Sequence, residues 1–263
     1  MLQQRKPVGE HLREWRQRRR LSQLDLACEA EISARHLSFL ETGRAQPSRE
    51  MVLRLAEQLQ VPLRDRNLLL VSAGYAPVFP ERPLDDPALS PARTAVELIL
   101  KAHEPSPALA IDRGWNLVLA NAAVAPLLRD VAPALLQLPV NVFRLALHPD
   151  GLAPRTVNLP EWRAHLLERL RREIEITADS GLIALMDEVA AYPAPAGPRH
   201  RPDPAAVVVP FQLATPSGVL SLVSTTTVFG TPVDVTVSEL ALETFFPADD
   251  ATARALAAAL AAT

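Results

Sequence analysis

Positively charged side chains cluster near the start of the 263-residue chain, where Arg16, Arg18, Arg19 and Arg20 follow closely on one another. Guanidinium groups bind phosphate oxygens, so this run is suited to neutralising a nucleic-acid backbone. Residues 1–66 hold 13 Lys and Arg against 9 Asp and Glu, whereas residues 67–263 hold 14 against 21. A basic head on an acidic body indicates an anionic partner for the head alone. The same run is also typical of a solvated helix face, and both interpretations stay open.

A second set of polar side chains lies among apolar residues in the C-terminal half. Asn141, Arg144 and His148 follow one another at helical spacing, and Trp162 opens a long charged segment downstream. An arginine in an apolar pocket can hold a carboxylate through two parallel hydrogen bonds. These four residues are therefore our candidates for ligand binding. In the alternative interpretation, Arg144 pairs with an acidic side chain of its own domain and Asn141 caps its helix.

Patterns of catalytic and cofactor sites do not occur in the sequence. There is no Gly-x-Ser-x-Gly, no phosphate-binding glycine loop and no dinucleotide fingerprint among its nine glycines. The histidines are scattered without the spacing of metal ligands, so we expect no metal, haem or other cofactor. We therefore predict that the protein is not an enzyme.

Composition points to a globular protein that acts inside the cell. Hydrophobic residues make up 48% of the chain and charged residues 22%, without an apolar run of membrane-spanning length. The N-terminus lacks the apolar core of a signal peptide, and the single cysteine, Cys28, excludes an internal disulfide. We expect a cytoplasmic protein that does not bind membranes.

Short helices must position the arginines of the head. Val8, Leu12 and Trp15 have helical spacing, and Leu24 is expected in the apolar stripe of the second helix. Gly43 ends the third helix because glycine tolerates a positive φ. Three later helices begin at serines in the N-cap position, Ser22, Ser33 and Ser48. Five short helices in about 75 residues predict a compact all-α domain, 1–75.

The rest of the chain predicts a mixed domain after a stiff, proline-rich linker at 76–91. Two short apolar runs around Asp112-Arg113-Gly114 have the composition of a hairpin. Further strands are expected at 206–215, 218–228 and 233–246. Helices are expected at 92–102, 159–178, 180–191 and 249–262, and 121–136 is expected to be helical with an interruption by proline. The order predicts an α+β domain, 92–263, with a five-stranded antiparallel sheet and helices on one face.

The spacing of two capped helices suggests how the head reads its partner. The helices that begin after Ser22 and Ser33, separated by Glu31 and Ile32, have the length of a helix-turn-helix. In that motif the second helix inserts its N-terminal residues into the DNA major groove. Arg44 then lies in the following loop, where the sugar–phosphate backbone would pass.

The stretch LSQLDLACEAEISARHLSFLETGRAQPSREMVLRLAEQL resembles the helix-turn-helix of the Xre/Cro/C1-repressor family, with the likeness covering residues 7–75. The matching features are Gln23, Ile32, Leu37, the Glu41-x-Gly43 exit and the Pro47-Ser48 restart. Glu31 departs from the family because the turn most often holds glycine there. A left-handed glutamate costs of order 1 kcal/mol, which does not disturb the assignment.

This resemblance implies roles for individual residues of the motif. It implies that Gln23 anchors a phosphate. It places four residues at the base edges: Ala34, Arg35, His36 and Phe39. It implies backbone contacts for Ser33, Ser38 and Arg44, and the run at the end of the first helix adds Arg16 and Arg19. Arg35 can pair with the O6 and N7 atoms of guanine. Phe39 either contacts the groove or belongs to the core of the domain, and both interpretations stay open.

The segments ALAIDRGWNLVLAN, NVFRLALHPDGLAPR and EWRAHLLERLRR resemble the MmyB-like regulators. In these an Xre-type head precedes a ligand-binding domain with a PAS-like fold. The resemblance implies a hydrophobic pocket between sheet and helices and a small apolar or fatty-acid-like ligand.

Together these features predict a ligand-responsive transcriptional regulator. We expect a repressor that binds an inverted repeat in double-stranded DNA as a homodimer. Two alternatives remain. The C-terminal domain serves only dimerisation or a protein partner, or the chain is an enzyme with an accessory DNA-binding head.

Overall fold

The computed structural model describes residues 6–193, 208–230 and 232–261. The chain divides into two compact units, one formed by Met1–Arg82 with Pro232–Ser238 and the other by Pro83–Thr231 with Glu239–Thr263. The predicted beginning of a strand at Ala206 and the predicted last helical residue, Ala262, lie outside the described residues. No helix in the described part of the chain has the length and apolar character needed to cross a membrane.

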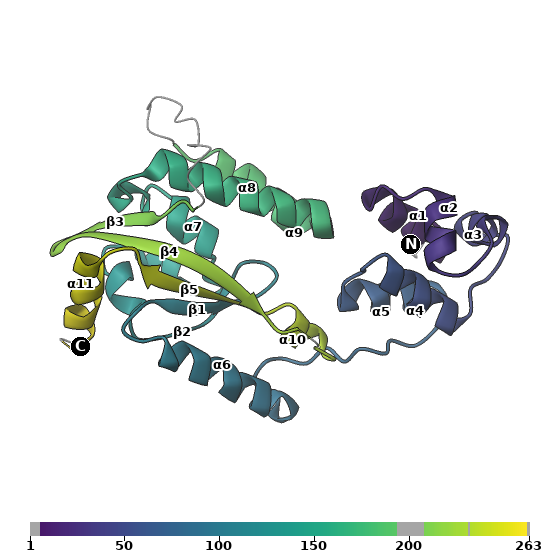
Figure 1. Cartoon of the computed structure of the whole chain (residues 1–263), viewed down its shortest axis with the longest axis horizontal. Helices are drawn as coiled ribbons and strands as arrows, with labels where there is room; N and C mark the ends of the chain where they lie inside the picture. The colour runs from purple at the N-terminus through teal and green to yellow at the C-terminus, as the bar shows by residue number, and fades with distance from the viewer. Residues whose placement is uncertain (1–5, 194–207, 231, 262–263) are drawn as a thin grey trace. The chain divides into compact units, whose positions relative to one another are not determined.

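The first unit is built on five helices (Figure 1). They are α1 (Val8–Arg18), α2 (Gln23–Glu29), α3 (Ala34–Glu41), α4 (Arg49–Gln58) and α5 (Leu63–Ser72). Ser22, Ser33 and Ser48 each accept a hydrogen bond from the backbone N–H three residues later, which confirms the predicted N-caps. One buried cluster draws on all five helices, including Leu12, Leu26, Leu37, Leu55 and Leu69.

Among the described residues of the first unit, five have a positive φ, and they include Glu31 with a φ of 53° and Gly43 with a φ of 73°. The others are Arg20, Gln60 and Gly74. The predicted strain at Glu31 is therefore present, at a cost of order 1 kcal/mol. The expectation for Leu24 was wrong, because its side chain is 63% exposed. Leu26 and Ala27 form the buried side of α2 instead, since Leu24 lies about 200° around the helix from Leu26.

A short helix, α10 (Val235–Ser238), completes the first unit. Val235 is fully buried, and its N–H donates to the carbonyl of Pro80 at 2.8 Å. Arg82 Nη1 lies 3.1 Å from Asp234 Oδ2, and α10 also contacts α5. The sequence predicted one strand over 233–246. Asp234 instead accepts a hydrogen bond from the backbone of Thr236 and starts a helical turn there.

The second unit contains a five-stranded antiparallel sheet, which confirms the predicted α+β, PAS-like class. The strand order is β2-β1-β5-β4-β3. The bounds are β1 (Ala108–Ile111), β2 (Leu117–Ala120), β3 (Phe211–Thr215), β4 (Gly218–Val228) and β5 (Ala241–Pro247). The hairpin predicted at Asp112-Arg113-Gly114 joins β1 to β2.

Helices cover both faces of this sheet, whereas one covered face was expected. Leu109 and Ile111 contribute to the larger core with α7–α9, and the alternating Ala108 and Ala110 pack with Val96 of α6. Figure 1 shows α8 and α9 on one side and α6 on the other. The bounds are α6 (Ser90–Ala102), α7 (Val142–Leu147), α8 (Leu159–Thr177), α9 (Ser180–Ala190) and α11 (Asp250–Ala261).

The segment 121–136 was predicted as helical with an interruption at proline, and it forms no α-helix. It contains two short 3₁₀ turns, η2 (Ala125–Leu128) and η3 (Pro133–Leu136). Pro126 and Pro133 each lack a backbone N–H, so a continuous α-helix cannot form. Two further turns of this kind are η1 (Pro87–Leu89) and η4 (Ala153–Arg155).

Candidate DNA interface and ligand cavity

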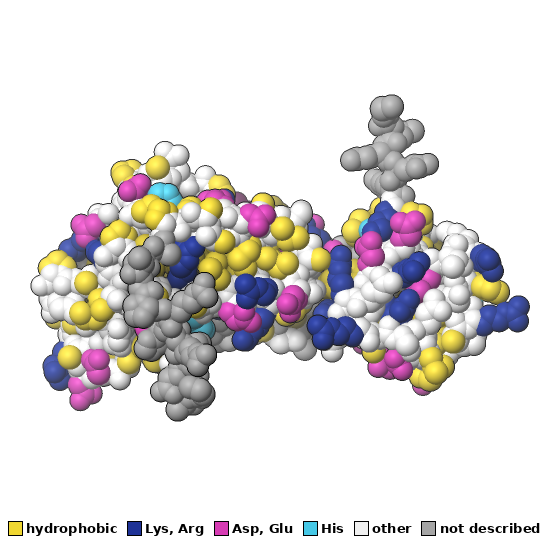
Figure 2. Space-filling model, turned by 90° about the horizontal axis from the view of Figure 1, so that it is seen from above, with side chains coloured by type: hydrophobic (Ala, Val, Ile, Leu, Met, Phe, Trp, Pro, Cys, Tyr) yellow, Lys and Arg dark blue, Asp and Glu magenta, His cyan; other side chains and the backbone are white. Residues whose placement is uncertain are grey.

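The outer side of α3 presents cations around one aromatic ring. Arg35 and Arg44 are exposed, and their guanidinium carbons lie 5.3 and 5.9 Å from the ring centroid of Phe39. Phe39 is half-buried and lies outside the buried cluster of the first unit. This cation–π geometry holds two arginines on one side of α3. Figure 2 shows Lys and Arg side chains on the visible face of this unit.

At the start of α3, Ser33 caps the helix N-terminus. Ser33 Oγ accepts a hydrogen bond from the backbone N–H of His36 at 3.1 Å, so its own hydroxyl proton remains for another acceptor. Ala34, His36 and Ser38 are half-buried. The positive end of the helix dipole adds to the attraction for a phosphate at this end.

Arg16 and Gln23 converge on Glu41, the last residue of α3. Arg16 is buried, and its Nε and Nη2 atoms lie 2.6 and 2.9 Å from the two carboxylate oxygens of Glu41. Gln23 Nε2 donates to the same carboxylate at 2.8 Å. The hydrogen bonds that Arg16 donates to the carboxylate of Glu41 raise the pKa of Arg16. Arg16 therefore joins α1 to α3 and is not available on the surface, while the amide of Gln23 is oriented by Glu41.

Arg19 also has partners within the first unit. Its guanidinium donates to the carbonyls of Leu59 and Gln60 at 2.9 and 3.0 Å, where α4 ends. Cations at a helix C-terminus satisfy otherwise unpaired carbonyls. The sequence had placed Arg16 and Arg19 on phosphates. Arg16 does not fit that role, because it is buried and its Nε, Nη1 and Nη2 atoms donate to Glu41 and to the carbonyl of Leu21. The phosphate contact of Arg19 stays a prediction, since the two carbonyls engage only its Nε and Nη2 atoms. Neither acceptor could be recognised locally, because the partners lie 25 and about 40 residues away.

In the second unit, Arg144 pairs with an acidic side chain, as the alternative interpretation held. Its Nε and Nη2 atoms lie 2.8 and 2.7 Å from the two carboxylate oxygens of Glu188 on α9. This hydrogen bonding lowers the pKa of Glu188 and raises that of Arg144. Burial, with a hydrogen bond to Glu188, raises the pKa of Tyr192 to about 12. Arg144 thus connects α7 to α9.

Asn141 and His148 occupy the two ends of α7. Asn141 Oδ1 accepts from the backbone of Phe143 and Arg144, which makes it the N-cap of α7, and its Nδ2 donates to the carbonyl of Gly114 at 2.8 Å. His148 Nδ1 accepts from the backbone N–H of Asp150 at 3.0 Å. Arg144, Asn141 and His148 are absent from the cavity walls described next, so of the four ligand candidates only Trp162 lies there.

An apolar cavity of about 100 Å³ lies between the sheet and helices α7 and α8. Strands, helices and the connecting turns all contribute to its wall, and every described lining residue is hydrophobic. The lining residues are Pro107, Leu109, Leu117, Val124, Leu127, Leu128, Val142, Leu145, Ala146, Leu152, Trp162, Phe211, Leu222 and Phe245. Such a cavity can hold the apolar body of a small molecule.

A second cavity of about 70 Å³ shares five lining residues with the first, Leu109, Val142, Ala146, Trp162 and Phe245. Its wall also contains Arg169 and Glu243, which form an ion pair. Arg169 donates to Thr226 Oγ1 at 2.5 Å and lies over the ring of Trp115 at 4.5 Å. The charged wall is therefore internally neutralised.

Trp162 lines both cavities. It stacks on Phe211 and His165 at centroid distances of 5.1 and 5.3 Å. Sequence spacing identified Trp162 by its place at the start of a long helix. It missed Val142, Ala146 and Leu127, because such residues are frequent in any core and carry no local signal.

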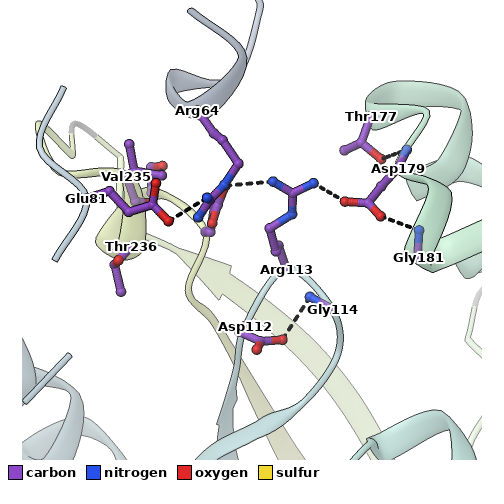
Figure 3. A network of polar contacts seen from close by, with 12 residues as sticks. Arg64, Glu81, Asp112, Arg113, Gly114, Thr177, Asp179, Gly181, Val235 and Thr236 are labelled. Carbon is purple, nitrogen blue, oxygen red and sulfur yellow. Dashed lines mark hydrogen bonds and ion pairs between the residues drawn. The ribbon is translucent and has the colours of Figure 1, made fainter. Parts of the chain in front are cut away.

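Polar contacts fix the hairpin and helix that border this core. Asp112 accepts from the backbone N–H of Gly114 at 2.8 Å, which closes the β1–β2 turn (Figure 3). Asp179 caps α9 through the backbone N–H of Gly181 and pairs with Arg113. The turn between α8 and α9 is thereby tied to the β1–β2 hairpin. No cluster of metal-binding side chains occurs in the ranges that the structure describes.

Comparison with protein families assigns the helix-turn-helix and the cavities to two different domains. Residues 7–69 match the helix-turn-helix domain, and residues 92–259 match the MmyB-like transcription regulator ligand binding domain. A comparison with curated proteins finds no match. The second match spans more than half of the chain and contains both cavities, while the first contains α3. The chain therefore belongs to the MmyB-like transcription regulators, DNA-binding proteins that carry a helix-turn-helix and a ligand-binding domain.

Proposed function

We propose that the protein is a transcriptional repressor whose affinity for its DNA site changes when a small, mainly apolar molecule occupies the cavity beside Trp162. The observation that carries this proposal is the fully hydrophobic wall of that cavity, inside the ligand-binding domain. A ligand alters DNA affinity only if it binds the DNA-bound and free forms differently. Repression is the default outcome for a head that occupies promoter DNA.

On the DNA side, we propose that Arg35 reads a base and that Arg44, Ser33 and Ser38 hold the backbone. Ala34, His36 and Phe39 complete the surface that faces the groove, and Gln23 contacts a phosphate with the amide proton not used by Glu41. The exposed guanidinium of Arg35, held beside Phe39, supports the first role.

A homodimer on an inverted repeat accords with the small reading surface of one helix-turn-helix. Leu98 and Ile99 of α6 are 68% and 41% exposed, and they are our candidates for the contact between two copies. The same observation supports an alternative function, in which the C-terminal domain serves only dimerisation. The two are distinguished by whether a small molecule binds.

The test begins with the full-length protein purified under native conditions. Its mass is measured in native and denaturing spectra, and any released compound is identified. In parallel, the DNA site is selected from random duplexes, and the affinity for that site is measured with and without the compound. We expect one bound molecule per chain and a change in DNA affinity of about fivefold or more, the lower range of typical allosteric coupling.

A cavity-filling variant provides the control for this experiment. Ala146 lines both cavities, so Ala146→Leu should weaken the binding of the ligand. The affinity of the ligand-free protein for DNA should not change. Ala184→Leu makes the same chemical change at an exposed position of α9, outside both cavities. A protein that carries no ligand, together with DNA affinity that no added compound alters, would favour dimerisation as the sole role.

A further inference from the structure

Trp162, which lines both cavities, carries a buried donor that has no acceptor among the described residues. Trp162 is 4% exposed, and its Nε1 atom finds no hydrogen-bond partner among the described residues. Buried polar atoms in proteins are nearly always paired, so an unpaired donor in a cavity wall requires an explanation. The ring cannot turn away easily, because it stacks on both Phe211 and His165. A ligand oxygen is one acceptor that would satisfy this N–H.

The charges around the cavities argue against an anionic ligand. None of the described residues that line the larger cavity is charged, and an uncompensated carboxylate there would lose its hydration without gaining a cation. In the smaller cavity, Arg169 already binds Glu243 and Thr226. A ligand carboxylate beside Arg169 would lie next to the buried carboxylate of Glu243, and like charges repel. Arg144, the other candidate cation, is held by Glu188.

The dimensions limit the size of the molecule. The two cavities measure about 100 and 70 Å³ and share five lining residues. An engineered apolar cavity of about 150 Å³ in another protein holds one benzene molecule. A compound of the size of one substituted ring therefore fits the combined space.

We infer that the ligand is a small uncharged molecule, mainly hydrocarbon and about the size of one substituted ring, with a carbonyl or ether oxygen that accepts the Trp162 Nε1 hydrogen. This inference rests on the proposed function, because it assigns a chemical class to the ligand of the same cavity. It assigns Trp162 two roles, an apolar wall and the donor that orients the ligand. A carboxylic acid is bound, if at all, in its neutral form.

Three probes of matched shape separate these chemistries. Cumene, acetophenone and benzoate have the same number of heavy atoms and the same branching, and they differ only in the head group. Their dissociation constants for the full-length protein are measured by calorimetry at neutral pH, where benzoate is an anion. We expect acetophenone to bind more tightly than benzoate.

The Trp162→Phe variant removes the donor and keeps an aromatic ring. It should raise the dissociation constant of acetophenone about three- to tenfold, which corresponds to the loss of one ordinary hydrogen bond. The dissociation constant of cumene should change by less than about twofold. Comparing each probe between the two proteins cancels the difference in hydrophobicity between the probes. Trp15→Phe makes the same chemical change in the other unit and serves as the control.

A spectroscopic measurement tests the hydrogen bond in the wild-type protein, without a substitution. In wild-type protein with ¹⁵N-labelled tryptophan, acetophenone should shift one indole N–H resonance to the position of a hydrogen-bonded proton, and cumene should not. The inference would be overturned if benzoate bound more tightly than acetophenone. It would also be overturned if Trp162→Phe weakened the binding of acetophenone and cumene equally. In both cases the cavity would remain a ligand site. Binding of none of the three probes would overturn the proposed function as well.

Discussion

Arg16 Nε lies 2.6 Å from Glu41 Oε1, so a buried ion pair joins α1 to the last residue of α3. The second pair of atoms, Arg16 Nη2 and Glu41 Oε2, is 2.9 Å apart. The contact fixes the C-terminal end of α3, whose N-terminal half we expect in the DNA groove. An arginine that the sequence suggested as a phosphate ligand instead determines where that helix lies.

Removing Glu41 should destabilise the first unit strongly. Glu41→Ala leaves the Arg16 charge buried without a partner, and such a change costs about 3–5 kcal/mol. Urea unfolding followed by far-ultraviolet circular dichroism measures the loss. The double variant Arg16→Met/Glu41→Leu replaces the pair with apolar side chains, and it should recover most of the lost stability. Equal destabilisation of the single and double variants would contradict this account.

Arg35 and Arg44 should differ in how they affect DNA binding. Arg35→Ala should cost about 1–3 kcal/mol on the selected site and relax the preference at one base pair. Arg44→Ala should weaken binding to all sequences alike and reduce the salt dependence by about one phosphate contact. Fluorescence anisotropy on matched duplexes measures both. Arg93→Ala, which removes the same charge from α6, is the control, and uniform weakening by Arg35→Ala would make that residue a phosphate ligand.

Gly9 allows α1 to approach the end of α3 closely. A Cβ atom at this position would lie 2.3 Å from the carbonyl oxygen of Leu40 and 2.7 Å from that of Glu41. Both are backbone atoms, so Gly9→Ala should displace one helix from the other. We expect lower thermal stability and weaker DNA binding, although α1 itself gains helix propensity from alanine. Gly43→Ala, with open space around the position, tests backbone strain alone, and a Gly9→Ala protein with raised stability would refute the close approach.

The Arg144–Glu188 pair should affect stability in acid and not ligand affinity. Because the folded-state pKa of Glu188 is lowered, its stabilising contribution is present above the ordinary glutamate range and is lost as the pH falls through the lowered pKa. Arg144→Gln removes the cause, so acid unfolding should begin at a higher pH. Both side chains are partly exposed, which limits the effect near neutral pH to about 0.2–1 kcal/mol. If Arg144→Gln changed the dissociation constant of the ligand, Arg144 would be part of the binding site.

His165 should make the folded state sensitive to mild acid. Burial, and secondarily Arg169 and Arg172, lowers the pKa of His165 in the folded protein. The unfolded chain binds the proton first, so stability is lost as the pH falls below about 6.5. His165→Phe keeps a ring against Trp162 and should flatten this part of the stability profile, measured as melting temperature against pH. An unchanged profile would show that His165 does not titrate differently on folding.

Local signals predicted much of the fold, while contacts between distant residues decided most of the site. Serine caps and glycine stops are read over three or four residues, and they placed the helices of the first unit. The strand at Gly218–Val228 was identified from its own composition. The role of Arg144 depended on Glu188, which lies 44 residues away. Likewise, alternating valines at 233–237 suggested a strand, but hydrogen bonds to residues 80 and 82 select a helical turn.

The DNA-binding unit is not a continuous N-terminal module, because α10 comes from a stretch more than 140 residues downstream. A fragment that stops at Arg82 would expose the surface of α5 that Val235 covers and would leave the carbonyl of Pro80 without its donor. Recombination that exchanges N-terminal heads between regulators would therefore sever the unit, unless Pro232–Ser238 travelled with its own head. The N-terminal residues of the DNA-binding unit and the segment that connects β4 to β5 must therefore be inherited together.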